Sequence, residues 1–123
     1  MATSKGYRPA LRQRTTERNV QDAIIARLAW HGWEVVEVSQ PQRVVGGLRG
    51  VPDLLAFKDG VTLFVEVKRP GGKRRESQDE FARRIEPHRR STLCYCVADD
   101  VDKFAYWLQG VEAAAGVDKV KEL

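Results

Sequence analysis

The chain has 123 residues, of which 42% are hydrophobic and 31% charged, and its formal net charge is +4. This length and composition are typical of one globular domain with its own core, and they exclude a two-domain protein. No run of about 18 apolar residues occurs, so we expect a cytoplasmic protein with no membrane partner.

The basic residues are concentrated before residue 98, and the last 26 residues are net acidic. Residues 1–14 combine four basic side chains with little apolar content, and we expect them to form a flexible arm. A basic excess favours a polyanionic partner such as DNA, because basic patches concentrate phosphate groups. A solvated basic surface with no ligand is the alternative.

The first helix is predicted from about residue 16 to residue 31. Val20, Ile24 and Leu28 recur at helical spacing, and Thr16 stands where an N-cap belongs. Glu17 lies seven residues before Ile24, so we expect its side chain to point toward the sheet. The alternative is an exposed acid that complements the helix dipole.

A β-hairpin is predicted after a strand over residues 33–38 and a loop over residues 39–49. Asp59-Gly60 separates two apolar runs, and a two-residue turn needs residues that tolerate positive φ. With these two residues as the loop, the position numbers of paired residues sum to 119, so Asp53 faces Glu66. A three-residue loop with a bulge would shift this pairing by one residue.

The pairing predicts that two carboxylates meet on one face of the sheet. Opposed like charges are destabilising, and a hard cation such as Mg²⁺ would compensate for them, since it takes one or two carboxylates and keeps several waters. Lys68 shares the face of Glu66 because side chains alternate along a strand. Two carboxylates and an ammonium group therefore converge.

A second helix is expected to begin after the loop at residues 69–75. Ser77 and Glu80 have the spacing of a capping box, with Ser77 as the N-cap, and the helix should end before Pro87. Gln78 lies in its first turn, near the end of the third strand. It is either a site residue or an ordinary polar residue of a helix start.

The last predicted elements are a strand over residues 92–97 and a helix through Leu108, for which Ala98-Asp99-Asp100 is the start signal. The large apolar residues of this helix indicate either core packing or a dimer contact. Residues 111–123 are predicted to form a tail or a short helix.

Pro52-Asp53, Glu66-Val67-Lys68 and the downstream Gln78 resemble the PD-(D/E)XK motif of restriction-endonuclease-like nucleases. With Gly50 and Leu54, the pattern is similar more narrowly to the VRR-NUC (virus-type replication-repair nuclease) family, stand-alone phage or bacterial type. The resemblance implies an α/β fold with a restriction-endonuclease-like αβββαβ core, a mixed four-stranded sheet flanked by helices, over residues 15–110.

The resemblance also implies a site. Asp53, Glu66 and the backbone carbonyl of Val67 would hold Mg²⁺ or Mn²⁺, with Glu17 in support, and no nucleotide cofactor is expected. Asp53, Glu66, Lys68 and Gln78 would form the catalytic set. Six basic loop residues, which a flexible connection alone would also explain, are candidate DNA contacts: Arg43, Arg49, Arg69, Lys73, Arg74 and Arg75.

The expected function is that of a metal-dependent, structure-selective DNA endonuclease of a bacterial or phage-infected cell. A domain without an added recognition module has few residues for contacting base edges, so DNA structure should matter more than sequence. Paired cutting of a branched substrate such as a four-way (Holliday) junction in DNA repair would require a homodimer. The alternatives are a flap, nicking or restriction-type nuclease, and a non-catalytic basic DNA-binding module.

Overall fold

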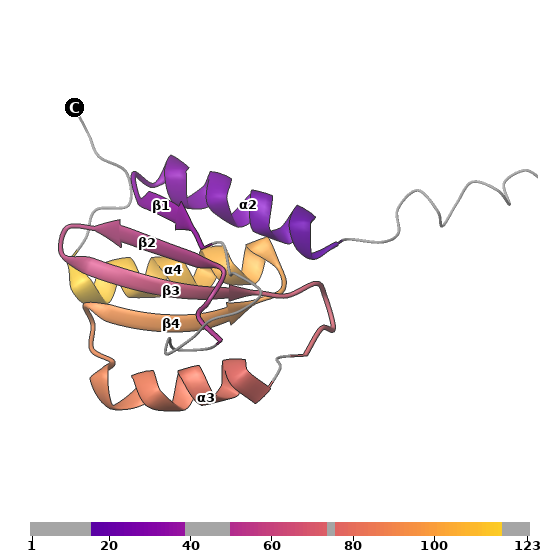
Figure 1. Cartoon of the computed structure of the whole chain (residues 1–123). Coiled ribbons are helices and arrows are strands. Elements are labelled where there is room, and N and C mark those ends of the chain that lie inside the picture. Colours follow the sequence, from indigo (N-terminus) through magenta and orange to yellow (C-terminus); the bar gives the residue numbers. More distant parts are fainter. Residues whose placement is uncertain (1–15, 39–49, 74–75, 117–123) are drawn as a thin grey trace, which may run out of the picture.

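The structure is a computed structural model, and it describes residues 16–38, 50–73 and 76–116. One four-stranded sheet lies between helices on both faces (Figure 1). The elements are α2 (Glu17–Trp30), β1 (Glu34–Glu37), β2 (Leu54–Lys58), β3 (Val61–Val67), α3 (Glu76–Ile85), β4 (Leu93–Ala98) and α4 (Val101–Ala115), with a 3₁₀ turn at Glu86–His88. The fold is α/β with the predicted αβββαβ order.

The β2–β3 hairpin has the predicted register. Leu54 pairs with Val65 and Lys58 with Val61, so the position numbers of each pair sum to 119. Asp59 and Gly60 form the two-residue turn, with φ values of 48° and 83°. Because both φ values are positive, as the tight hairpin turn requires, no bulge shifts the pairing.

The sheet is mixed, as predicted. Its strand order is β1-β2-β3-β4; the first two pairings are antiparallel, and β3 and β4 are parallel. α3 connects these two parallel strands, which need a crossover connection. The central strand β3 is therefore covered on both edges and both faces, which explains its nearly continuous apolar sequence.

The main core lies on the face of the sheet that α2 and α4 cover. Alternate β3 residues from Val61 to Val67 are buried there against α2 residues such as Ile24 and α4 residues such as Phe104. The other alternate residues of β3, including Phe64 and Glu66, lie on the α3 face. α3 packs on this second face (Figure 1).

Two predicted helix ends are wrong. α3 begins at Glu76, so Ser77 lies inside the helix and is not its N-cap. α4 continues through Ala115 and not only through Leu108. Three consecutive alanines, the best helix formers, extend α4, and Gly116 ends it in the left-handed conformation with φ 73°. The helix therefore includes the first part of residues 111–123, which were predicted as a tail or a short helix.

Other predicted ends are confirmed. Thr16 is the N-cap of α2, and its hydroxyl accepts a hydrogen bond from the Asn19 N–H. Asp100 caps α4 in the same way, and α3 ends two residues before Pro87. Among the helices of the described ranges, none is long and apolar enough to span a membrane.

Candidate functional site

Four predicted site residues meet where β2 begins and β3 ends. Asp53 directly precedes β2, Glu66 is the second-last residue of β3, and Lys68 directly follows β3. The hairpin register, extended by one pair, puts Asp53 opposite Glu66. Gln78 reaches the same point from α3, the helix on that face (Figure 1).

Glu66 is the centre of this cluster. Its side chain is fully buried, and its Oε2 accepts a hydrogen bond from the Gln78 amide and lies 3.5 Å from the Lys68 ammonium. Its Oε1 is buried and receives no hydrogen bond from a donor of the described residues, and the Asp53 carboxyl lies close enough to share a hydrogen bond with Glu66 when one of the two is protonated. Buried polar atoms are almost always paired, so this oxygen requires an explanation.

Two backbone contacts hold Asp53 in place. Its Oδ2 accepts a hydrogen bond of 2.8 Å from the Val67 N–H, and its carbonyl oxygen accepts one of 2.8 Å from the Val38 N–H. The first bond joins the start of β2 to the end of β3, and the second joins it to the end of β1. The carboxylate therefore keeps a fixed position beside Glu66.

This arrangement destabilises the ionised form of Glu66. Burial first, and the neighbouring Asp53 carboxylate second, raise the pKa of Glu66 from 4.5 to about 8, although the Lys68 ammonium opposes this shift. Without further positive charge, the protonated form is the stable one at neutral pH. The site thus contains two carboxyl groups, Asp53 and Glu66, but a single neighbouring cation among the described residues, Lys68.

Lys68 is held by the next strand. Its N–H donates a hydrogen bond of 2.9 Å to the carbonyl of Ala98, at the end of β4. Its side chain is nearly buried and extends toward Glu66. Val67, between them, points its side chain into the core on the opposite face.

Glu17 does not join the cluster, and its predicted orientation toward the sheet is wrong. Its side chain is exposed, and no three His, Cys, Asp or Glu residues of the described part of the chain gather closely enough to hold an ion. Val20 is the first residue of α2 that the core buries. Contact with the sheet therefore begins almost one turn after Glu17, where helical periodicity alone predicted a continuous buried stripe.

The predicted DNA contacts are described only in part. Arg69 and Lys73 are exposed on the segment that follows β3 directly, next to Lys68 in the chain. Arg43, Arg49, Arg74 and Arg75 lie outside the described residues. The exposed cations that the structure does describe at this point suit a partner with phosphate groups.

The donor set fits a hard divalent cation. Asp53 and Glu66 supply two opposed carboxylates, and the buried Oε1 of Glu66, which no described donor occupies, would be available as an oxygen ligand. Mg²⁺ sites commonly use one or two carboxylates with water and substrate oxygens completing the shell, so a third acidic side chain is not required. A positive ion would also offset the repulsion that raises the pKa of Glu66.

A second buried polar cluster was missed at the sequence level. Glu112 of α4 is fully buried, and its carboxylate accepts hydrogen bonds of 2.9 Å from Trp33 Nε1 and pairs at 2.9 Å with His31 Nδ1. A signal was present, because Glu112 continues the helical spacing of Phe104 and Leu108. An acid in a buried stripe needs partners, and these come from the segment between α2 and β1.

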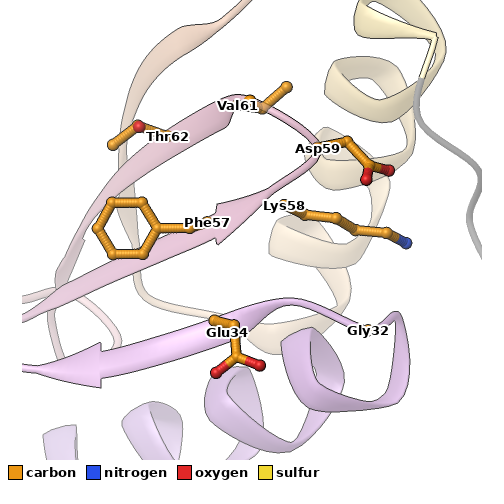
Figure 2. Close-up of a pocket in the computed structure, with 8 residues that line it drawn as sticks. Gly32, Glu34, Phe57, Lys58, Asp59, Val61 and Thr62 are labelled. Carbon is orange, nitrogen blue, oxygen red and sulfur yellow. The ribbon is translucent and has the colours of Figure 1, made fainter.

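Near this cluster, at the turn end of the hairpin, is a hollow of about 400 Å³ (Figure 2). Glu34, Phe57, Lys58 and Asp59 line it, and the Lys58 ammonium donates to the His31 carbonyl. Lys58 is five residues along β2 from Asp53, about 17 Å at 3.3 Å per residue. The hollow is thus separate from the Asp53 and Glu66 pair.

Comparison with known proteins gives no functional assignment. No protein-family model matches the chain, and no curated protein matches its sequence.

Proposed function

We propose that the protein is a metal-dependent DNA endonuclease that hydrolyses phosphodiester bonds at the Asp53 and Glu66 pair. The observation that carries the proposal is the fully buried Glu66, whose Oε1 receives no hydrogen bond from a described donor and whose carboxyl lies against that of Asp53. Two opposed carboxylates with an adjacent lysine match the charge pattern that phosphodiester hydrolysis requires.

Each side chain has a distinct task in this proposal. Asp53 and Glu66 hold Mg²⁺ or Mn²⁺, together with the Val67 carbonyl; the ion supplies charge neutralisation and lowers the pKa of water. The Gln78 amide occupies Oε2 of Glu66 and leaves Oε1 for the ion. Lys68 orients or deprotonates the attacking water, or neutralises charge on the phosphate.

The bond changes follow from this arrangement. The attacking water gives up a proton and its oxygen forms a bond to phosphorus, the bond from phosphorus to one ester oxygen breaks, and the departing oxygen takes up a proton. Lys68 is the described cation closest to the carboxylate pair in the chain, and its ammonium lies 3.5 Å from Glu66, where it would be beside a bound phosphate. Arg69 and Lys73 follow it and suit contacts with the flanking phosphates.

Branched DNA, such as a four-way junction, is the proposed substrate, and a homodimer the proposed active form. Support comes from the family resemblance and from the small size of the domain, which favours recognition of backbone shape over base sequence. A dimer with two-fold symmetry would match the symmetry of a junction. Flap, nicking and restriction-type activities remain the alternatives within nucleases.

The test is cleavage of labelled linear, nicked, flap and four-way DNA with Mg²⁺ or Mn²⁺. Asp53→Ala, Glu66→Ala and Lys68→Ala should each lower the rate by about 100-fold or more, since each removes charge at the reacting phosphate. Glu34→Ala and Lys103→Ala change exposed charges elsewhere and should cut like the wild type.

Undiminished cutting by any of the three site variants would refute the assignment. DNA binding that persists in EDTA, with no cleavage of any substrate, would instead support a non-catalytic DNA-binding module. Sedimentation that shows only monomer at micromolar concentration would refute the dimer.

A further inference from the structure

α3 rests on the sheet through two nearly buried side chains. Gln78 is 4% exposed and Phe81 3%, and residues three apart lie on the same side of a helix. The Phe81 ring meets Phe64 edge-to-face, with centroids 5.4 Å apart, and lies 6.1 Å from the Tyr95 ring. Such aromatic pairs contribute specific geometry in addition to buried area.

The two contacts follow one another along the helix and along the strand. Phe64 and Glu66 lie on the same face of β3, about 6.6 Å apart, and Gln78 and Phe81 are separated by about 4.5 Å of helix rise. Because Phe81 contacts Phe64 while Gln78 contacts Glu66, α3 runs in the direction opposite to β3. The contact of Phe81 with Phe64 therefore places Gln78 near Glu66.

Tyr95 adds the constraint from the neighbouring strand. It is the register partner of Phe64 in the parallel β3–β4 pair, so the Phe81 ring contacts both strands at the same level. Because the Phe81 ring contacts side chains of both strands, it restricts movement of α3 along the strands and also from one strand to the next. The position of α3 set by this ring brings Gln78, one turn earlier in the helix, within hydrogen-bonding reach of Glu66.

We propose that Phe81 is a positioning residue of the site: it seats α3 so that the Gln78 amide binds Oε2 of Glu66 and leaves Oε1 to the cation. The proposal rests on the proposed function for its effect on metal binding and cleavage. Phe81 itself contacts Phe64, which lies two residues before Glu66 on β3, and Tyr95 on β4. It acts on Glu66 only through Gln78.

A double-mutant cycle tests this route of action. Phe81→Ala and Gln78→Ala should each weaken Mn²⁺ binding and slow cleavage by roughly 10-fold, the lower end of what loss of an outer partner of a metal ligand costs. The double variant should be no worse than either single one, because both changes remove the same contact. A purely structural role for Phe81 predicts that the two effects multiply to roughly 100-fold, which would overturn the proposal.

Ile85→Ala is the matched control, since Ile85 is a half-buried apolar residue of α3, one helical turn beyond Phe81. It should lower stability but leave Mn²⁺ affinity within about twofold of the wild type, because truncations that leave a ligand's partners intact act mainly on folding. Phe81→Leu replaces Phe81→Ala if the latter does not fold. Loss of Mn²⁺ affinity in Ile85→Ala equal to that in the Phe81 variant would count against a specific role.

A second readout is independent of metal and DNA. The side-chain amide resonances of Gln78, assigned by their loss in Gln78→Ala, should move to the position of a free glutamine in Phe81→Ala and stay unchanged in Ile85→Ala. Unchanged resonances in a folded Phe81→Ala would refute the positioning role. If the wild type neither binds Mn²⁺ nor cuts DNA, the proposed function fails, and this measurement still decides whether Phe81 seats Gln78.

Discussion

Glu66 should make the metal-free protein less stable as the pH rises. Its pKa is 4.5 in an unfolded chain and about 8 in the folded protein, so between these values the folded state binds more protons than the unfolded state. The protonated carboxyl contributes its full stabilising free energy below pH 4.5, and this contribution is lost as the pH rises toward 8. The loss is about 3 kcal/mol at pH 7 and about 5 kcal/mol above pH 8.

The assay is urea unfolding in EDTA at pH 5, 6, 7 and 8. Glu66→Gln keeps the shape of the side chain but cannot ionise, so its free energy of unfolding should fall less with pH than that of the wild type. The gap between the two proteins should grow by about 3 kcal/mol from pH 5 to pH 8. Glu80→Gln, an exposed change on α3, should follow the wild type.

Parallel curves for wild type and Glu66→Gln would refute this reasoning. A divalent cation should reverse the trend, since it binds the ionised carboxylate and so stabilises the fold more at higher pH. Calorimetry in buffers of different ionisation enthalpy should show that Mn²⁺ binding at pH 7 releases close to one proton. Binding without proton release would place the ion away from Glu66.

Three further predictions concern other parts of the fold. Glu112→Ala should lower the free energy of unfolding by about 3 kcal/mol, because it leaves two buried donors unpaired, and Glu112→Gln should lower it by less. Urea titration measures both losses, and equal losses would contradict the hydrogen-bond account. Burial raises the pKa of the Cys96 thiol to about 12, so iodoacetamide at pH 8 should leave Cys96 unmodified in the folded protein and label it in urea, as mass spectrometry would show. Gly60→Ala should cost about 1 kcal/mol, since Gly60 has φ 83° and a Cβ there meets no atom within 4 Å; a loss above 3 kcal/mol would point to an unseen contact.

The parts of the fold that follow from local sequence were predictable. The Asp59-Gly60 turn determines the hairpin register, and with it the opposition of Asp53 and Glu66, because a two-residue loop allows only one pairing. The burial of Val20 likewise follows from helical periodicity. Each of these inferences uses residues within a single element or hairpin.

The errors occur where an element ends or meets a distant one. Periodicity predicted that Glu17 continues the buried stripe of α2, but periodicity gives a direction and not the point at which the sheet ceases to cover the helix. The pairing of Glu112, in a segment predicted as a tail or a short helix, was missed because its partners, His31 and Trp33, are about 80 positions earlier in the chain. Which distant residues meet depends on tertiary packing, which local patterns do not encode.

The bond network of Glu112 has a consequence for the order in which the chain can fold during synthesis. The hairpin that carries Asp53 and Glu66 has both its strands within 14 residues, so it can pair as soon as that stretch has left the ribosome. His31 and Trp33, made earlier, have to wait for Glu112 near the end of α4 before their donors are paired. A nascent chain stopped before Glu112 would therefore leave these buried donors unpaired in an incomplete domain, which quality-control proteases can attack until α4 is complete.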